Sequence, residues 1–359
     1  MTHELTALLK DLSAAVGVSG YEQAIIDLLR ARYAPYVDKF ETDKMGNLLM
    51  FKRGAPPGDS APRRTVMLAA HIDEIGAMVT QIDRGFLNIT AVGGLDARML
   101  LGQEVVVFGR QTYHGLIASR PPHFRGEDRS KVPPLSALQV DLGLDPETVA
   151  QNVRVGDVVA IKKSPVELLD GLLGGKAFDN RASVAALYVC LKELSRLAHQ
   201  WDVVAVASCQ EEVNGAGAAT VAYRLKPDVA VAVDMTFADV PGVDEGNPTQ
   251  LNKGPAPAIG ANIHPVILKQ LQDTAKTLEM PLQLEPLPAN SGTDAWAMQT
   301  SHNGIPTALL SIPLRYMHAP VETISVNDVA RAGRLLAHFI AGLSDDFAAR
   351  LIPTDGLED

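Results

Sequence analysis

The amino-acid sequence predicts an α/β fold, a mixed sheet flanked by helices, with an inserted all-β barrel domain. Three features predict it. Apolar residues recur at helical spacing near the N-terminus. From about residue 77 to residue 163, short runs rich in valine and isoleucine replace that spacing, and turn residues separate them. After residue 175, uniformly apolar strands alternate with helices, as expected when both faces of a sheet are covered.

The length of 359 residues suits about two domains, at roughly 100–200 residues each. We therefore expect an α/β domain made of two separate parts of the chain, with the barrel between them. The expected limits are 1–76 and 166–359 for the two parts of the α/β domain and 77–165 for the barrel.

Composition and charge narrow the range of partners. Apolar residues make up 47% of the chain and charged residues 21%, which is typical of soluble globular proteins. The net charge is −10 and no cluster of lysine and arginine occurs, so we expect no nucleic-acid partner. No run of apolar residues is long enough to cross a membrane, so we expect no membrane association.

The first ten residues do not resemble a secretory signal. The two cysteines, Cys190 and Cys209, favour a reducing compartment, and we expect a cytoplasmic protein.

The N-terminal part begins with two expected helices and a strand. The first helix covers residues 4–16, because Leu5, Leu8, Leu9, Leu12 and Val16 share one helical face. Ser19 and Glu22, three residues apart, predict a capping box at the start of a second helix that carries Ile25, Ile26 and Leu29. Residues 65–70 are an apolar run that predicts a buried strand, and His71 follows it directly.

The expected barrel strands are four short runs, at 86–92, 104–108, 113–118 and 157–161. The segment 123–134 is charged and contains proline, which indicates an exposed loop. Beyond it, the apolar pattern predicts three buried strands and three helices. The strands are expected at 203–208, 229–233 and 307–312, and the helices at 180–197, 264–279 and 327–343.

Acidic and imidazole side chains follow several of these strands. Ligands of open α/β sheets bind beyond the carboxyl ends of the strands. His71, the pair Glu211 and Glu212, and Asp234 stand at three such ends, Asp179 opens a helix, and His318 follows the last strand. Each residue alone has an ordinary structural explanation, such as a helix N-cap for Asp179. Their joint occurrence at successive strand ends favours a shared site.

Imidazole and carboxylate groups are the ligands of borderline and hard divalent metals. Two metals about 3.5–4 Å apart can share a bridging carboxylate and a water. One histidine and one carboxylate for each metal, with a shared aspartate, accounts for the set. Asp73 is placed to hold the second nitrogen of His71. Glu211 and Glu212 are adjacent and point in different directions, so one can bind metal while the other acts as a general base.

Seven short motifs follow one another along nearly the whole chain. They are Ser19-Gly20-Tyr21-Glu22, Ala70-His71-Ile72-Asp73-Glu74-Ile75-Gly76, Gly93-Gly94-Leu95-Asp96, Ala177-Phe178-Asp179-Asn180-Arg181, Gln210-Glu211-Glu212-Val213, Ser291-Gly292-Thr293-Asp294 and His318-Ala319-Pro320-Val321-Glu322. In this order they resemble the motifs of the tetrahedral, or TET-type, dinuclear zinc aminopeptidases. That family includes glutamyl and deblocking aminopeptidases and FrvX-like and CelM-like relatives.

The resemblance implies a role for each residue of the set. It implies that Asp179 bridges two metals, that Glu211 is the general base and that Asp73 supports His71. The remaining ligands would be His71 and Asp234 on one metal, and Glu212 and His318 on the other. The metals are expected to be zinc, although cobalt and manganese suit the same ligands.

The resemblance also implies a zinc-peptidase-like fold, with the inserted β-barrel used for dimerisation, and a homo-oligomer that ranges from a dimer to a tetrahedral dodecamer. One position departs from the family, which usually has tryptophan where this chain has Leu95. We expect that change to affect assembly or the rim of the pocket. Asn262 and His264 could reach the site of a neighbouring subunit.

The function implied is a metallo-aminopeptidase that acts on peptide substrates. The main alternative keeps the metals but changes the substrate, as in an N-acyl-amino-acid deacylase or amidase. A glycosidase is disfavoured because sugar sites use carboxylates without metal and aromatic platforms. This chain has 5% aromatic residues and only Trp201 and Trp296 as tryptophans. A non-catalytic scaffold is disfavoured by the complete ligand set. Ser291-Gly292-Thr293-Asp294 either lines a specificity pocket or forms a structural turn.

Overall fold

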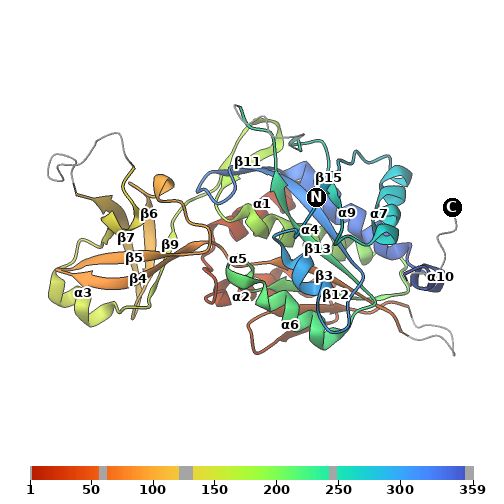
Figure 1. Ribbon diagram of the computed structural model, residues 1–359, viewed down its shortest axis with the longest axis horizontal. Helices are drawn as coiled ribbons and strands as arrows, with labels where there is room; N and C mark the ends of the chain where they lie inside the picture. Colours follow the sequence, from red (N-terminus) through yellow and green to blue (C-terminus); the bar gives the residue numbers. More distant parts are fainter. Residues whose placement is uncertain (1, 56–62, 121–131, 242–248, 352–359) are drawn as a thin grey trace.

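The larger part of the molecule is built on an 11-stranded mixed sheet. The computed structural model describes residues 2–55, 63–120, 132–241 and 249–351 (Figure 1). The strands follow the order β1-β2-β12-β3-β13-β16-β17-β11-β10, and β14 and β15 attach beside β16. The central strands β12, β3, β13 and β16 are parallel to one another. Their carboxyl ends therefore meet at one edge of the sheet.

The strands of this sheet have the following bounds. They are β1 Lys39–Thr42, β2 Leu48–Lys52, β3 Thr65–His71, β10 Val166–Glu167, β11 Leu172–Gly175, β12 Asp202–Ser208, β13 Val229–Phe237, β14 Ala256–Gly260, β15 Glu285–Leu287, β16 Thr307–Arg315 and β17 Glu322–Ser325.

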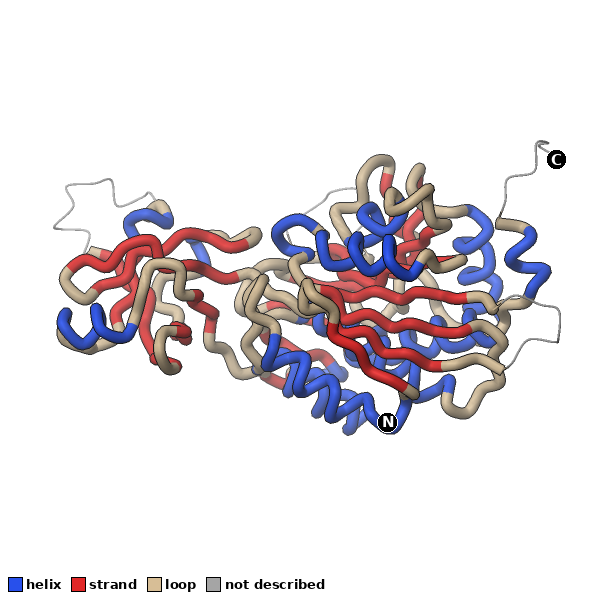
Figure 2. The backbone as a smooth tube through the Cα atoms, turned by 90° about the horizontal axis from the view of Figure 1, so that it is seen from below, coloured by secondary structure: helices blue, strands red, loops and turns tan. Residues whose placement is uncertain are grey.

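Helices cover both faces of the sheet (Figure 2). They are α1 Thr2–Ala14, α2 Gln23–Tyr33, α4 Phe178–Leu194, α5 Glu211–Asn214, α6 Ala216–Leu225, α7 Pro265–Thr277, α8 Asp294–Gln299, α9 Val326–Ala341 and α10 Asp345–Ala349. Helix α4 packs against α1, α9 and the central strands, and α8 packs against α6 and the same sheet. All residues of α4 except Lys192 and Glu193 are buried, because this helix lies between α1, α9 and the central strands.

The second part is a closed barrel with the order β4-β5-β8-β7-β6-β9, which lies at one end of the molecule in Figure 1. Its elements are β4 Gly76–Asp83, β5 Phe86–Val92, β6 Glu104–Phe108, β7 Thr112–Ser119, β8 Leu138–Asp141, α3 Pro146–Asn152 and β9 Val158–Ile161. Every strand pair in it is antiparallel. Closure leaves no unpaired sheet edge, and the barrel has its own apolar core around Val79, Leu87, Val107 and Val140.

The α/β fold with an inserted barrel is confirmed, while the limits of the domains stay a prediction. The capping box was a wrong expectation. Helix α2 begins at Gln23, and its N-cap residue Glu22 makes no side-chain capping bond. Ser19 donates its hydroxyl hydrogen to Asp73 instead, and Glu22 Oε1 accepts from the Gly20 amide. Most of the expected loop at 123–134 lies outside the described residues. No helix in the described ranges is long and apolar enough to cross a membrane.

Candidate metal centre

A cleft of about 610 Å³ opens at the carboxyl ends of the parallel strands. His71 ends β3, and its backbone partner Ser208 ends the neighbouring strand β12. Three residues after Ser208 the chain enters α5 with Glu211. The structure brings all the expected ligands and the expected base into the lining of this one cleft: His71, Asp179, Glu211, Glu212, Asp234 and His318.

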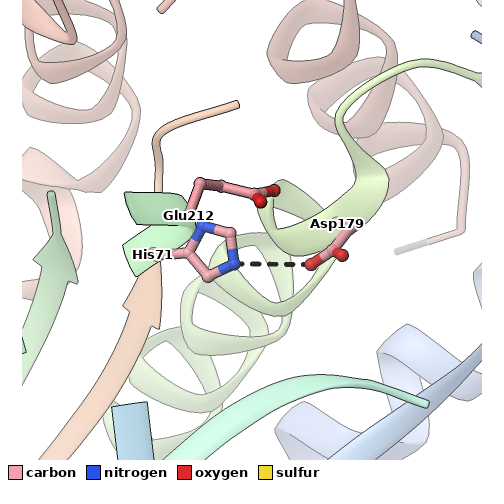
Figure 3. Close-up of side chains that lie close together, drawn as sticks. All are labelled: His71, Asp179 and Glu212. Carbon is pink, nitrogen blue, oxygen red and sulfur yellow. Dashed lines mark ion pairs between the residues drawn. The ribbon is translucent and has the colours of Figure 1, made fainter. Parts of the chain in front are cut away.

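Asp179 lies between the two histidines. Its Oδ1 is 3.4 Å from His71 Nε2, and its Oδ2 is 3.4 Å from His318 Nε2. Figure 3 shows the first of these contacts as a dashed line. Each half of the site then has one further carboxylate. Asp234 Oδ1 is 3.9 Å from His71 Nε2, and Glu212 Oε2 is 3.3 Å from His318 Nε2.

These distances fit a pair of cations. Ligand atoms about 2.0–2.2 Å from a tetrahedral ion lie about 3.3–3.6 Å from one another. The contacts of Asp179 and Glu212 fall in that range, and the contact of Asp234 is slightly longer. One ligand atom each from His71, Asp179 and Glu212 lies within 4.8 Å of the others. The residues present therefore suit divalent metal, with Asp179 between the two histidines.

Asp73 supports the site from behind His71. His71 Nδ1 lies 3.2 Å from the backbone oxygen of Asp73 and 3.4 Å from its Oδ1. Oxygen atoms of this kind only accept hydrogen bonds, so in the neutral ring Nδ1 carries the hydrogen and Nε2 presents its lone pair to the cleft. The Asp73 carboxylate also accepts the backbone amides of Glu211 at 3.1 Å and Glu212 at 3.2 Å. One buried side chain thus positions His71 and both glutamates.

Glu322 is a second supporting carboxylate, to which the sequence pattern alone assigned no role. It is buried and accepts the backbone amides of Asp179 and His318, each at 3.1 Å. Burial, and then the charge of Asp179, raises its pKa well above the usual value. Its place four residues after His318 in a recognised motif was the only signal available. Glu322 accepts hydrogen bonds from backbone amides, which every residue except proline has. The residue types in the sequence therefore do not reveal which residues Glu322 contacts.

The charges of the site are far from balanced. Burial raises the pKa of Glu211 to about 8, although the charge of His71 opposes this, and burial also raises the pKa of Asp234 well above its usual value. Hydrogen bonds to Asp179 and Glu212 raise the pKa of His318 to about 10. Burial alone would lower the pKa of His71, but hydrogen bonds to Asp179 and Asp73 raise this pKa well above its usual value. Buried carboxylates in this number need protons or cations nearby.

Metal binding should therefore release protons. Below its raised pKa each imidazole holds a proton, and a ligating imidazole must be neutral. Apparent metal affinity should rise as the pH increases from 7 towards 10, because protons compete less well in that range. Titration calorimetry in buffers of different ionisation enthalpy measures the released protons. Heats that do not depend on the buffer would contradict this expectation.

Gly94 connects the barrel to the metal site. It follows β5, and a Cβ atom added there would lie 2.5 Å from His318 Nδ1. The replacement Gly94→Ala should therefore push the His318 ring away from Asp179 and weaken metal binding by about tenfold or more. A metal titration followed by activity or thermal stability measures this.

The matched control for Gly94 is Gly174→Ala. Its new Cβ would meet no atom closer than 3.8 Å. Equal metal affinity in the Gly94 variant and in the control would show that the close approach to His318 is unimportant.

Several other sequence expectations concern the surroundings of the site. Ser291, Gly292 and Thr293 line the cleft, and Thr293 also caps α8. A role of this segment in specificity stays a prediction. Leu95 packs against the barrel core. Asn262 is buried, and His264 Nε2 lies 3.2 Å from the Leu351 backbone oxygen. The expectation that these two residues reach the site of a second subunit stays a prediction.

The fold and the site together define a protein with an α/β sheet, an inserted barrel and a buried cluster of imidazoles and carboxylates that suits divalent metal. Comparison with known proteins identifies the family. The chain belongs to the M42 glutamyl aminopeptidase family, whose family model matches residues 46–335. This confirms the resemblance drawn from the motifs, and it favours a peptidase over the glycosidase and scaffold alternatives.

Individual relatives agree with this membership. The chain is 34% identical to the lysyl aminopeptidase of Pyrococcus furiosus, over 90% of this chain and 92% of that protein. Its structure is similar to that of an aminopeptidase from the archaeon Desulfurococcus kamchatkensis, with a TM-score of 0.90, 34% identity and 99% of each chain covered. It is also similar to the TET1 peptidase of Pyrococcus horikoshii, with a TM-score of 0.82, 27% identity, and 94% and 100% of the two chains covered.

Proposed function

We propose that the protein is a metallo-aminopeptidase that releases N-terminal amino acids from peptides, with Glu211 as the general base. The observation that carries this proposal is the position of Asp179, which offers one oxygen to each of two histidines. We assign His71 and Asp234 to one metal, Glu212 and His318 to the other, and Asp179 to both. Zinc is the expected metal, and cobalt or manganese would suit the same donors.

The chemistry follows from the assignment. Two divalent ions held by these residues would polarise the scissile carbonyl and acidify a water. Glu211 is positioned to accept a proton from that water. Its side chain is 15% exposed to the cleft, whereas that of Glu212 is 5% exposed. Glu211 accepts a proton from the attacking water and returns it to the leaving amine. Asp73 keeps the backbone of Glu211 in position through the amide bond at 3.1 Å.

The alternative is a deacylase or amidase that uses the same residues. The two activities differ in the substrate's N-terminus, because an aminopeptidase needs a free α-amine. The test supplies purified protein with zinc, cobalt or manganese and compares leucyl- and lysyl-p-nitroanilide with their N-acetylated forms. We expect only the free amines to be cleaved. Cleavage of the acetylated forms alone would favour the alternative and overturn the proposal.

Assembly and location belong to the same proposal. The TET1 peptidase of Pyrococcus horikoshii can assemble into a tetrahedron or a large octahedral shell. We propose that this chain also forms homo-oligomers, from a dimer to a tetrahedral dodecamer, through its barrel. Exposed apolar side chains on the barrel, Leu101, Leu116 and Val155, would suit such a contact. We propose a cytoplasmic location, which agrees with two free, buried cysteines. Light scattering of the purified protein measures the subunit number.

A further inference from the structure

The cleft contains one carboxylate that the metal site does not use. Glu285 lies on β15 and lines the same cleft as the metal ligands. Two hydroxyl groups hold it. Thr236 donates to Oε1 at 2.6 Å, and Ser311 donates to Oε2. The carboxylate is therefore fixed in one place, while each oxygen keeps a further lone pair for a ligand.

The sheet register places this carboxylate beside the reaction centre. Ser311 on β16 is the backbone partner of Asp234 on β13, so their side chains lie on the same face of the sheet. Thr236 lies two residues after Asp234 and shares that face as well. Neighbouring strands are about 4.8 Å apart, and alternate residues of one strand are about 6.5–7 Å apart. Glu285 is thus held by two residues that share a sheet face with Asp234, a residue that we assign to a metal.

The rest of the cleft wall suits a long side chain with an apolar stem. Phe237, Leu287, Trp296 and Met317 line it. Among the described residues that line the cleft there is no lysine or arginine, and the two histidines belong to the ligand set. Outside the ligands and the base, Glu285 is the charged group of this lining. Apolar walls that lead to a fixed carboxylate match the stem and head of lysine or arginine.

We propose that Glu285 selects peptides with a basic N-terminal residue, by accepting charge-assisted hydrogen bonds from the side-chain cation of lysine or arginine. The inference rests on the proposed aminopeptidase function, because it needs the substrate's first residue to enter this cleft. Glu285 is a specificity residue that contacts the substrate side chain and takes no part in the proton transfer.

The size of the effect follows from the bond type. A hydrogen bond to a charged group contributes about 1.5–3 kcal/mol, which corresponds to about a 10- to 150-fold difference in kcat/KM. Glutamine keeps the shape of the side chain and can accept one hydroxyl hydrogen, so Glu285→Gln should remove the charge with little change in packing. The loss of this negative charge should lower kcat/KM for basic substrates alone.

The experiment measures kcat/KM for lysyl-, arginyl-, leucyl-, norleucyl- and glutamyl-p-nitroanilide. We expect the wild-type protein to prefer lysyl over norleucyl substrate by about tenfold or more. In Glu285→Gln that preference should disappear, while leucyl hydrolysis stays within about twofold of wild type. The matched control is Asp239→Asn, which removes a carboxylate that pairs with Arg315 and does not line the cleft. The control should keep the preference.

The outcomes separate this inference from the proposed function. Turnover without a basic preference in the wild type overturns the inference alone. An equal loss for every substrate in Glu285→Gln shows a purely structural role and also overturns it. No turnover of any substrate with a free amine overturns the proposed function together with the inference. The lysyl–norleucyl comparison uses only the wild-type protein, so a missing basic preference overturns the inference even where the variant does not fold.

Discussion

Replacing Glu211 by glutamine is expected to remove nearly all peptidase turnover while the protein keeps its metals. The change preserves the shape of the side chain but removes its ability to accept and return a proton. General acid–base catalysis contributes about 10²–10⁴-fold to a rate, so kcat should fall by that factor. Glutamine keeps a carbonyl oxygen in place of the carboxylate, and Glu211 is assigned to neither metal, so metal content should change little. Steady-state hydrolysis of aminoacyl-nitroanilides and elemental analysis measure the two quantities.

The neighbouring residue supplies the control. Glu212→Gln is the same chemical change one position along the chain, but Glu212 Oε2 lies 3.3 Å from His318 Nε2. This variant should lose metal, and excess metal should restore part of its activity. Near-wild-type hydrolysis by Glu211→Gln would show that another group is the base. Rescue of Glu211→Gln by excess metal would assign it to the ligands instead.

Replacing Asp179 by asparagine is expected to abolish metal binding and activity together. The side chain contacts both histidines through different oxygens, so its loss weakens both halves of the site. Bound metal stabilises the folded state by a free energy that grows with the logarithm of its affinity. The rise in melting temperature on addition of zinc should therefore disappear in Asp179→Asn. Elemental analysis and a thermal melt with and without metal measure the effect.

A surface carboxylate serves as the control for Asp179. Glu41→Gln removes a charge of the same sign from an exposed ion pair with Arg224. Such pairs contribute little to stability, so this variant should keep its metals, its turnover and its metal-dependent melting temperature. An Asp179→Asn protein that still bound two ions per subunit would rule out the bridging assignment.

Much of the site could be predicted because it lies at strand ends. Apolar runs predicted strands next to His71, Ser208 and Asp234, and parallel order brings their carboxyl ends together. The third strand continues past Asp234 to Phe237, so Asp234 lies inside β13. The strand order itself depends on pairings such as β12 with β3, which the residue pattern does not specify. The residue pattern placed Asp179 and His318 in the shared site, the family resemblance supplied their roles, and their approach is now visible as a distance of 3.4 Å.

The supporting residues could not be predicted in the same way. Glu322 acts on two backbone amides, and any residue provides such an amide. Glu285 lies on β15, a strand of three residues that contains Pro286 and has no alternating pattern. The failed capping box has a related cause, because the hydroxyl of Ser19 is taken by Asp73, a residue 54 positions away. Local patterns do not reveal such long-range competition.

The central claim is that two cations lie on either side of Asp179, and an anomalous-diffraction map measured at the metal's absorption edge tests it most directly. We predict two peaks per subunit, about 3.5–4 Å apart, one beside His71 and Asp234 and the other beside Glu212 and His318. A single peak that Asp179 does not contact, or metal-saturated crystals with no peak in this cleft, would contradict the account.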